Sequence, residues 1–374
     1  MILPADDLSG AAEVAGILWS AGGEVEVQIG REPTPTTGDL VIDTETRGLP
    51  PAEAARVVRE TCAGLARQGL RLDFKKVDSV LRGPVRAEVE AALEALDLRR
   101  CILLPCNPSR GRTLEGGHYR VHGVPLHETE FAADPAHPAR TSSAFELLGP
   151  GELPVVSAGP GDALPEEAIV LADARCAADV AAWAARADPG SLSAGAADFL
   201  QALLARRGMV PHRASEPMPT GLRLLVSGSA SATSRAAIDQ AEASGTPVVR
   251  LPITASEGSP EVRRAAQAIA EALSASPWAI LCIAGPHCAE PAAPHRLEQA
   301  LAEAAAAAPA SVPVDQLLLE GGSTAAATLA RLGLRRLRVV GQPAPGIVRL
   351  RAIGAEAPEI VTKPGSYAWG APFG

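Results

Sequence analysis

One short stretch, residues 74–83, concentrates side chains that bind oxyanions and move protons. It contains Lys75, Lys76, Asp78 and Arg82, although the chain uses arginine for most of its positive charge and has lysine elsewhere only at Lys363. Lysine is a compact donor with an adjustable pKa, and arginine grips a carboxylate or phosphate through two parallel hydrogen bonds. The stretch predicts an anion-binding site, with a solvated strand end carrying an incidental charge cluster as the simpler alternative.

Two neighbouring carboxylates, Asp6 and Asp7, form a second candidate position. They follow a very short apolar segment and precede an Ala-rich helix expected from about Ala11 to Ser20. Enzymes of the α/β class place functional groups at such carboxyl ends of strands. Asp7 or Ser9 is expected to cap the helix, which leaves one carboxylate of the pair for other work.

These groups suit the binding of a small acid and the transfer of a proton. Basic side chains can clamp a carboxylate, and an aspartate can accept the proton of a hydroxyl nucleophile, as phosphoryl transfer requires. The candidate residues of the first half are Asp6, Asp7, Arg47, Lys75, Lys76, Asp78 and Arg82.

Two junctions in the second half are rich in Gly, Ser and Thr, namely Ser227–Ser231 and Gly321–Thr324. Glycine lets the backbone approach a ligand, and the following helix presents unpaired N–H groups and a positive dipole end. Neither junction is a Walker motif, and neither shows the GxGxxG pattern of dinucleotide-binding proteins. Taken alone, each could be a tight turn. Together with Lys363-Pro364-Gly365, they favour a nucleotide-binding site.

Alternating strands and helices must position all of these groups. The alternation is typical of parallel sheets wrapped by helices, and we expect an α/β protein of two domains, residues 1–215 and 216–374, each with a mainly parallel sheet flanked by helices. Strands are expected near residues 40–43, 74–78, 100–105, 168–174, 222–226, 247–251, 278–284, 317–320 and 337–340. Helices are expected near residues 52–68, 84–96, 177–186, 196–207, 231–244, 260–275, 294–307 and 324–332.

The segment from Asn107 to Pro138 breaks this alternation. It is rich in Gly, His and Pro and has no clear period, so we expect an irregular loop that faces substrate or forms a dimer. Its histidines match no standard zinc spacing, which leaves any metal ligand unassigned. These histidines are His118, His122, His127 and His137.

The composition of the chain argues against several classes of protein. The 374 residues carry a net charge of −9 and 47% apolar residues, which argues against the broad basic surface of a nucleic-acid-binding protein. The six cysteines form no CxxC pair and are expected to be reduced. No apolar run approaches the length of a membrane span, and the first residues do not resemble a secretion signal. We therefore expect a cytoplasmic protein.

At this point the motifs resemble those of the four-carbon acid sugar kinase family. Ala5–Ala11 is similar to the family's Ala-Asp-Asp-Leu-Thr-Gly-Ala opening, and Lys75–Gly83 is similar to its Lys-Lys-Ile-Asp-Ser-Thr-Leu-Arg-Gly. The resemblance runs in order along nearly the whole chain. The other matching stretches are Thr44–Arg47, Gly111–Thr113, Gly117–Tyr119, Asp134-Pro135, Ser227–Ser229, Gly321–Thr324 and Lys363–Tyr367.

The resemblance implies an N-terminal domain that binds an acid sugar and a C-terminal domain that binds ATP. Family members phosphorylate the terminal hydroxyl of acids such as threonate, erythronate or 3-oxo-tetronate, and Mg²⁺ would accompany the ATP. Asp7 and Asp78 are then candidates for the general base. The implied acid-sugar contacts are Asp6, Asp7, Arg47, Lys76, Asp78, Arg82 and Gly83, and the implied ATP contacts are Ser229, Gly321, Gly322, Ser323, Thr324 and Gly365.

The chain departs from the family pattern at several positions. Ser323 stands where the family has Glu, and Val80 replaces a Thr. Pro364 and Tyr367 occupy positions where Ser and Phe are usual, and the chain is short for the family.

We predict an ATP-dependent kinase of four-carbon acids. Two alternatives stay open. A binding protein could retain the acid-sugar site with an altered nucleotide loop, for which Ser323 is the main support, and an oxidoreductase is disfavoured by the missing GxGxxG motif.

Overall fold

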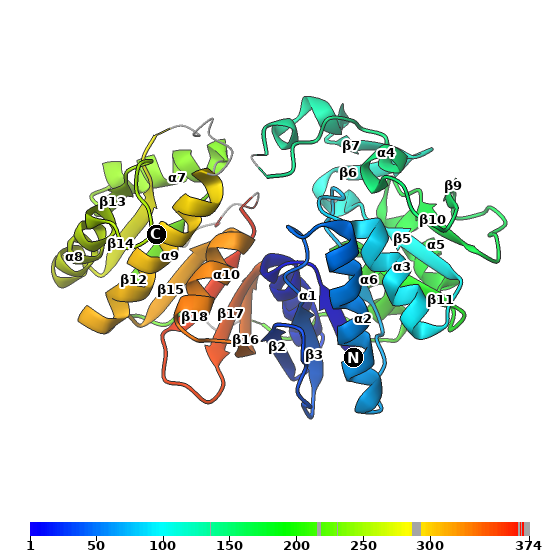
Figure 1. Cartoon of the computed structure of the whole chain (residues 1–374), viewed down its shortest axis with the longest axis horizontal. Coiled ribbons are helices and arrows are strands. Elements are labelled where there is room, and N and C mark those ends of the chain that lie inside the picture. Colours follow the sequence, from blue (N-terminus) through cyan, green and yellow to red (C-terminus); the bar gives the residue numbers. More distant parts are fainter. Residues whose placement is uncertain are drawn as a thin grey trace. The chain divides into compact units, whose positions relative to one another are not determined.

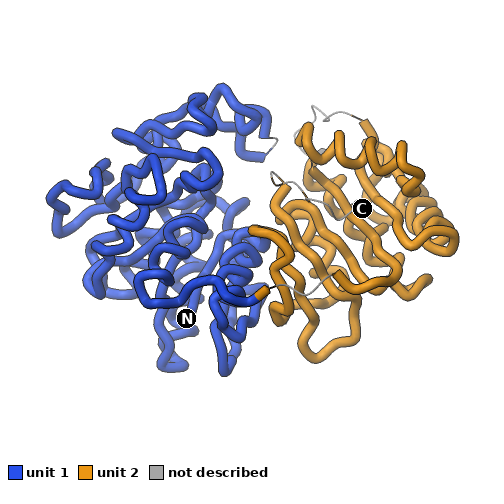
Figure 2. The backbone as a smooth tube through the Cα atoms, turned by 180° about the vertical axis from the view of Figure 1, so that it is seen from behind, with its two compact units in different colours: residues 1–213 blue, residues 214–374 orange. Residues whose placement is uncertain are grey.

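A computed structural model of the chain describes residues 1–134, 136–214, 218–229, 231–285, 293–365, 367 and 369. The chain divides into two compact units, Met1–Arg213 and Ala214–Gly374 (Figure 2). Pro135, Ala230, Cys288 and Ser366, which belong to motifs or counts discussed above, lie outside the described residues.

Unit 1 is built mainly from parallel strands flanked by helices (Figure 1). Its strands outside the 107–138 segment are β1 (Ile2–Ala5), β2 (Val25–Ile29), β3 (Asp39–Asp43), β4 (Lys75–Lys76), β5 (Arg100–Leu104), β9 (Val155–Ala158), β10 (Ala168–Ala172) and β11 (Ser191–Gly195). Its α-helices are α1 (Leu8–Ser20), α2 (Pro51–Arg67), α3 (Val85–Leu96), α4 (Ala144–Leu148), α5 (Ala177–Arg186) and α6 (Ala197–Arg206). One sheet has the order β4-β11-β5-β10-β9, and β1, β3 and β2 pair in parallel beside α1.

Local chemistry explains where two helices of this unit begin. Asp7 caps α1, and its carboxylate accepts a hydrogen bond of 2.8 Å from the backbone N–H of Gly10. Pro51 occupies the first turn of α2, where its missing N–H costs nothing because that group has no partner within a helix. Both helices therefore start close to the loops that carry candidate site residues.

The segment that the sequence analysis expected to be irregular contains an antiparallel sheet. Its strands are β6 (Arg112–Glu115), β7 (His118–Val121) and β8 (Val124–Pro125), with the short 3₁₀ turns η1 (Pro108–Arg110), η2 (Leu126–Glu128) and η3 (Glu130–Ala133) around them. Gly116-Gly117 and His122-Gly123 join successive strands, and all four residues have positive φ. Two-residue hairpin turns require this conformation, so the glycine pattern was the signal for the hairpins.

Unit 2 also combines a largely parallel sheet with helices. Its strands are β12 (Arg223–Ser227), β13 (Val248–Leu251), β14 (Trp278–Ile283), β15 (Gln316–Glu320), β16 (Arg336–Ala344), β17 (Ile347–Ala352) and β18 (Glu359–Lys363). Its helices are α7 (Ala232–Ala243), α8 (Pro260–Ala275), α9 (Ala293–Ser311) and α10 (Gly322–Arg331). The order is β16-β17-β18-β15-β12-β14-β13. Strand β17 pairs antiparallel with β16 and with β18, and the other neighbours in this order pair in parallel.

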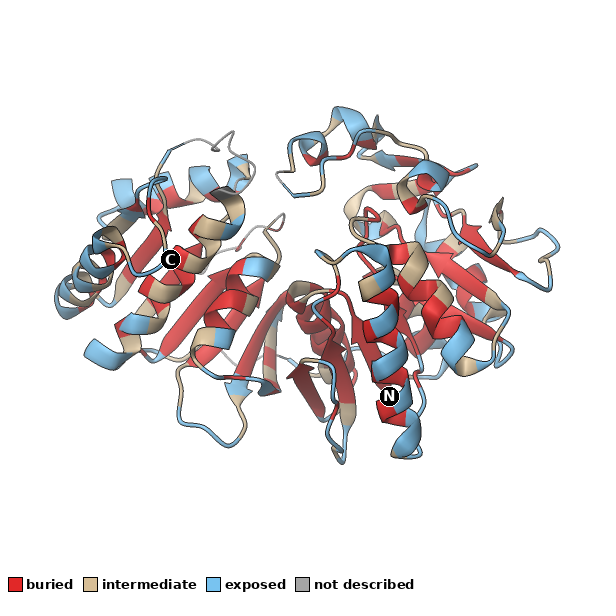
Figure 3. Cartoon of the chain, viewed as in Figure 1, coloured by how far each residue is buried: buried red, intermediate tan, exposed pale blue. Residues whose placement is uncertain are grey.

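The central strands of both units are buried (Figure 3). In unit 1, Phe74 packs edge to face on Phe199 with ring centroids 6.0 Å apart. In unit 2, Leu225, Ile280, Leu318 and Val361 form one apolar cluster of neighbouring strands. The cores consist chiefly of Leu, Val, Ile and Ala, because the sequence has only 3% aromatic residues.

The fold class predicted from the sequence is confirmed, because parallel-rich sheets with flanking helices form both units. Several strands were nevertheless missed, namely β2, β9, β11, β17 and β18. The stretch at residues 74–83 forms a strand at Lys75–Lys76 alone and continues as a loop. Within the described residues, none of the helices combines the length and the apolar character that crossing a membrane would require.

Candidate active site

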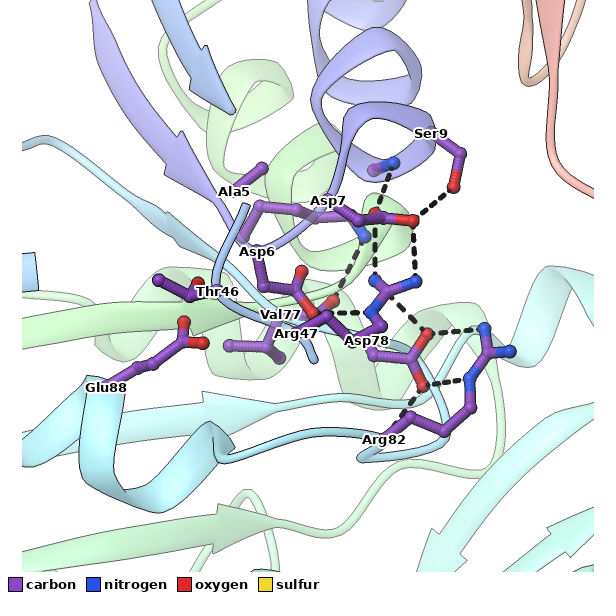
Figure 4. Close-up of polar contacts among 12 residues, drawn as sticks. Ala5, Asp6, Asp7, Ser9, Thr46, Arg47, Val77, Asp78, Arg82 and Glu88 are labelled. Carbon is purple, nitrogen blue, oxygen red and sulfur yellow. Dashed lines mark hydrogen bonds and ion pairs between the residues drawn. The ribbon is translucent and has the colours of Figure 1, made fainter. Parts of the chain in front are cut away.

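Three loops of unit 1 bring a cluster of charged side chains together. Asp6 and Asp7 follow β1, Arg47 lies between β3 and α2, and Asp78 and Arg82 follow β4. Figure 4 shows their carboxylates and guanidinium groups pointing toward one another. The five residues were proposed from sequence alone as parts of one site, and the structure places them in direct contact.

Arg47 lies at the centre of this charge cluster. Its Nε donates to Asp6 Oδ2 at 2.8 Å, and its two terminal nitrogens donate to the carboxylate of Asp7 at 2.6 and 2.8 Å. The same guanidinium lies 3.5 Å from Asp78 Oδ1. One arginine therefore compensates three carboxylates, and its planar fork fixes the geometry of Asp7 in particular.

Arg82 extends the charge cluster on the other side of Asp78. It contacts both carboxylate oxygens of Asp78, at 2.8 and 3.1 Å, and donates to Asp134 Oδ2 at 2.9 Å. The backbone N–H groups of Val80 and Arg82 also donate to Asp78 Oδ2. The side chain of Arg82 is 28% exposed, which makes it the more accessible of the two arginines, since that of Arg47 is 16% exposed.

The charge cluster keeps its central carboxylates ionised. Burial favours the neutral form of Asp78, but Arg82 and Arg47 outweigh that effect and hold its pKa well below the usual value. The pKa of Asp6 is also lowered, because Arg47 and the nearby lysines outweigh its burial. At neutral pH both groups can accept hydrogen bonds from hydroxyl groups, and neither can donate one.

Asp43, at the end of β3, behaves in the opposite way. Its side chain is fully buried, and burial together with the nearby carboxylates raises its pKa well above the usual value. The backbone N–H of Glu45 donates to Asp43 Oδ1 at 2.9 Å, while Oδ2 has no hydrogen-bond partner. Burial thus makes ionisation of Asp43 less favourable than that of Asp6 and Asp78, whose pKa values are lowered.

The two adjacent lysines, Lys75 and Lys76, are buried inside unit 1. Lys75 Nζ forms an ion pair of 2.5 Å with Glu88, and neither side chain is more than 1% exposed. Lys76 Nζ donates to the carbonyl of Val77 and lies 3.5 Å from Glu13. Contact of Lys76 with a substrate stays a prediction, and any such contact would have to share its ammonium group with these partners.

Gly83 provides room beside Arg47. Its φ is +83°, and a Cβ added there would lie 2.8 Å from the carbonyl oxygen of Arg47. A side chain would therefore strain the loop and displace the backbone that carries the central guanidinium. This observation gives Gly83 a structural reason to be glycine, whereas substrate contact through Gly83 stays a prediction.

Three loops of unit 2 meet at the carboxyl ends of neighbouring strands. Ser227–Ser229 follows β12, Gly321–Thr324 follows β15, and the Lys363–Gly365 segment ends β18. The hydroxyl of Ser229 donates to the carbonyl of Gly365 at 3.4 Å. The structure thus brings together the residues that the sequence analysis assigned to one nucleotide-binding site, although no ligand contact tests that assignment.

The close approach of these loops depends on glycine. A Cβ at Gly228 would lie 2.3 Å from Thr324 Oγ1, and a Cβ at Gly365 would lie 3.3 Å from Ser229 Oγ. Gly321 precedes α10 with φ of +95°. Gly322, Ser323 and Thr324 form the first turn of α10. The backbone N–H groups of such a turn have no partner within the helix and can donate hydrogen bonds to phosphate oxygens.

Several site residues escaped sequence reasoning. Asp134 was noted only as part of a motif, yet it pairs with Arg82. Glu13, Glu88 and Glu320 pair with Lys76, Lys75 and Lys363, respectively. The usable signal was the rarity of lysine, since buried lysines require carboxylate partners, but the sequence does not indicate which carboxylates fold next to them.

The structure offers no ready-made cation site in the part of the chain that it describes. Across these residues, no group of three or more His, Cys, Asp or Glu side chains is arranged to hold a metal ion. Mg²⁺ commonly reaches kinases through substrate phosphates and one or two carboxylates. The ligands of any Mg²⁺ therefore stay unassigned.

Comparison with known families divides the chain in a similar way. A family model described as a sugar-binding N-terminal domain matches residues 1–203, and one described as a nucleotide-binding C-terminal domain matches residues 224–367. A solved structure from Salmonella typhimurium aligns with a TM-score of 0.78 at 19% identity, covering 98% of this chain and 96% of that chain. This likeness supports the fold.

Three relatives carry kinase names. A D-threonate kinase of Salmonella typhimurium is 36% identical over 41% of this chain, and a D-erythronate kinase of Heliobacterium modesticaldum is 29% identical over 40%. These matches span 38% and 35% of the two relatives' own lengths. A 3-oxo-tetronate kinase of Cupriavidus necator is 27% identical over 97% of this chain and 93% of the relative. By its two domain matches and these relatives, the chain belongs to the four-carbon acid sugar kinase family.

Proposed function

We propose that this protein is an ATP-dependent kinase that phosphorylates the terminal hydroxyl of a four-carbon acid sugar. The observation that supports the proposal most strongly is the charge cluster around Arg47, in which Asp6, Asp7 and Asp78 meet two arginines. Carboxylates orient and deprotonate sugar hydroxyls, and a guanidinium binds an acid group. In this proposal, residues 1–215 bind the acid and residues 216–374 bind ATP with Mg²⁺.

Each group in the charge cluster has a proposed task. Arg82 binds the substrate carboxylate because it is the more exposed arginine, while Arg47 orients the three aspartates around it. Asp6 accepts hydrogen bonds from substrate hydroxyls. Asp7 or Asp78 accepts the proton of the attacking hydroxyl. A low pKa does not exclude Asp78 from this task, because a loose phosphoryl-transfer transition state relies on positioning more than on a strong base.

The loops of unit 2 are proposed to bind the phosphates of ATP. Ser229 and Thr324 offer hydroxyl groups, and Gly321, Gly322 and Gly365 leave the backbone accessible. Bound Mg²⁺ would offset charge on the transferring phosphoryl group. Ser323 takes the place of a family glutamate, so the first turn of α10 carries a hydroxyl instead of a carboxylate at this position.

A panel of four-carbon acids, tested with ATP and Mg²⁺ in an ADP-release assay, examines the proposal directly. We expect ADP release that depends on one or more of threonate, erythronate and 3-oxo-tetronate. The alternative function is a binding protein without catalysis, for which Ser323 is the specific support. Isothermal titration separates the two, because absence of ATP binding at millimolar concentration would exclude the kinase.

A further inference from the structure

A buried ion pair lies beneath the candidate nucleotide loops of unit 2. Lys363 Nζ and Glu320 Oε1 are 2.6 Å apart, and each side chain is 1% exposed. Glu320 is the last residue of β15 and Lys363 is the last residue of β18, and the two residues are partners in the parallel register. The pair therefore sits where both strands turn into the loops.

The lysine of this pair holds the loop that follows β18. Lys363 Nζ donates to the carbonyl oxygens of Pro364, at 3.1 Å, and of Tyr367. The ammonium group also lies 5.4 Å from the ring centroid of Trp369. Burial lowers the pKa of Lys363, and Glu320 counteracts part of that effect. A single ammonium group thus ties together several points of the terminal loop.

The carboxylate of the pair also contacts the start of α7, the helix that follows the loop after β12. Ser234, in the first turn of α7, donates its hydroxyl to Glu320 Oε1, and the indole N–H of Trp369 donates to Glu320 Oε2 at 3.4 Å. Both oxygens of Glu320 are therefore occupied. Lys363, Ser234 and Trp369 thus all hold the carboxylate of Glu320 in place.

Ser234 continues the connection to the loop after β12. Its hydroxyl lies 3.0 Å from Ser229 Oγ and 2.8 Å from Ser231 Oγ. Ser229 and Ser231 also approach the carbonyl of Gly365. The contacts form one continuous network from the β12 loop, through the ion pair, to the terminal loop.

We propose that Glu320 and Lys363 are positioning residues that hold the loops after β12, β15 and β18 in the form that binds ATP, without contacting the nucleotide themselves. The inference rests on the proposed function. Its physical basis is that both charges are buried and fully engaged with loop atoms. A buried pair adds little net stability over apolar residues of similar size, so geometry is a reason for its presence.

Glu320→Gln is the central test, and Glu359→Gln is its matched control. Glu359 is the first residue of β18 and also forms a buried ion pair, with Arg349 at 2.7 Å. In both variants an oxygen that accepts a hydrogen bond is replaced by an NH₂ group. The donor that loses its acceptor is Trp369 in Glu320→Gln and Arg349 in Glu359→Gln. The two changes are chemically alike but lie at opposite ends of the paired strands β15 and β18.

We expect Glu320→Gln to raise the Kd of ATP with Mg²⁺ by about tenfold or more, as loss of a buried charge contact does. The KM of the acid should stay within about twofold, a difference of less than 1 kcal/mol by the same relation. Glu359→Gln should lower the melting temperature and leave the Kd of ATP unchanged. Hydrogen exchange in the peptide that contains residues 363–369 should accelerate in Glu320→Gln alone.

Equal ATP affinity in Glu320→Gln and Glu359→Gln, or unchanged exchange in the terminal peptide of Glu320→Gln, would overturn the inference. If Glu320→Gln does not fold, Ser234→Ala provides the milder variant, and an unchanged Kd for ATP in that variant also overturns it. Failure of the unmodified protein to bind ATP instead overturns the proposed function. The exchange measurement then still decides whether the pair holds the loops.

Discussion

The charge cluster of unit 1 and the loops of unit 2 are built from different chemistry. Asp6, Asp7, Arg47, Asp78 and Arg82 present their charged ends to one another in unit 1. The loops of unit 2 present glycine backbone and hydroxyl groups, and the ion pair Glu320–Lys363 is buried at the ends of the strands that lead into them. Side-chain charge therefore dominates the first region and backbone shape the second.

The two regions should therefore respond differently to mutation. A compensated charge cluster loses most stability when its shared central cation is removed, because several carboxylates then stay in a poorly solvated place without a counter-charge. A backbone-lined loop fails when a side chain enters it, because the backbone can no longer approach a ligand. Substitutions that remove a charge should therefore affect unit 1 most, and substitutions that add volume should affect the loops of unit 2 most.

The largest effect is expected from Arg47→Ala. The variant leaves three carboxylates without their shared cation, so the free energy of unfolding should fall by about 3–5 kcal/mol. Urea denaturation measures this change. Arg59→Ala is the control, because the Arg59–Glu94 pair is exposed and should cost no more than about 1 kcal/mol. Equal losses in both variants would show that the charge cluster is not specially coupled.

Arg82→Ala should remove activity while the protein stays folded. Asp78 keeps its backbone donors and Arg47, so the melting temperature should change little. Loss of the carboxylate-binding guanidinium should lower kcat/KM for the acid on the order of 100-fold or more. Kinetics with four-carbon acids measure this effect, and full activity in the variant would assign Arg82 to structure alone.

Gly228→Ala tests the loops of unit 2 by adding a methyl group where they approach each other. The added methyl group would lie 2.3 Å from Thr324 Oγ1, so either the Thr324 hydroxyl must rotate away or the loops after β12 and β15 must separate. We expect ATP affinity to fall about tenfold, with the acid KM unchanged. Gly161→Ala is the control because nothing lies within 4 Å of its added Cβ. A change in acid KM instead of ATP affinity would contradict the assignment.

Asp43→Asn should stabilise the protein, unlike substitutions in the charge cluster. The folded-state pKa of Asp43 is raised, so its favourable contribution exists below the unfolded pKa and is lost as pH rises through the folded pKa. An amide removes this loss, so the free energy of unfolding should rise relative to the unmodified protein, and the gain should be larger at pH 8 than at pH 4. Denaturation at both pH values measures the gain, and destabilisation at pH 8 would be inconsistent with a buried neutral carboxyl.

The smallest effect is expected from Ser323→Glu, which restores the carboxylate usual in the family. We expect the Mg²⁺ concentration for half-maximal activity to fall about threefold, because a carboxylate at the first turn of α10 adds an oxygen ligand. Titration of activity with Mg²⁺ measures this change. No shift would indicate that Ser323 meets the needs of this protein without a carboxylate.

Sequence alone was sufficient to predict the α/β class and to select the residues that meet in each region. The alternation of apolar strands and amphipathic helices along the sequence predicted the α/β fold class. The rarity of lysine drew attention to Lys75 and Lys76, and Asp78 and Arg82 follow them in the same stretch. The Asp7 cap followed from its place before α1. Each of these signals is local, so it can be read without knowledge of distant contacts.

Only the tertiary structure decided which charges face the site and which support it from inside. Lys75 and Lys76 are buried and pair with Glu88 and Glu13, whereas contact of Lys76 with a substrate stays a prediction. Lys363 likewise pairs with Glu320, 43 positions away. The physical reason is that burial and ion pairing depend on which strands become neighbours, and residue spacing along the chain does not contain that information.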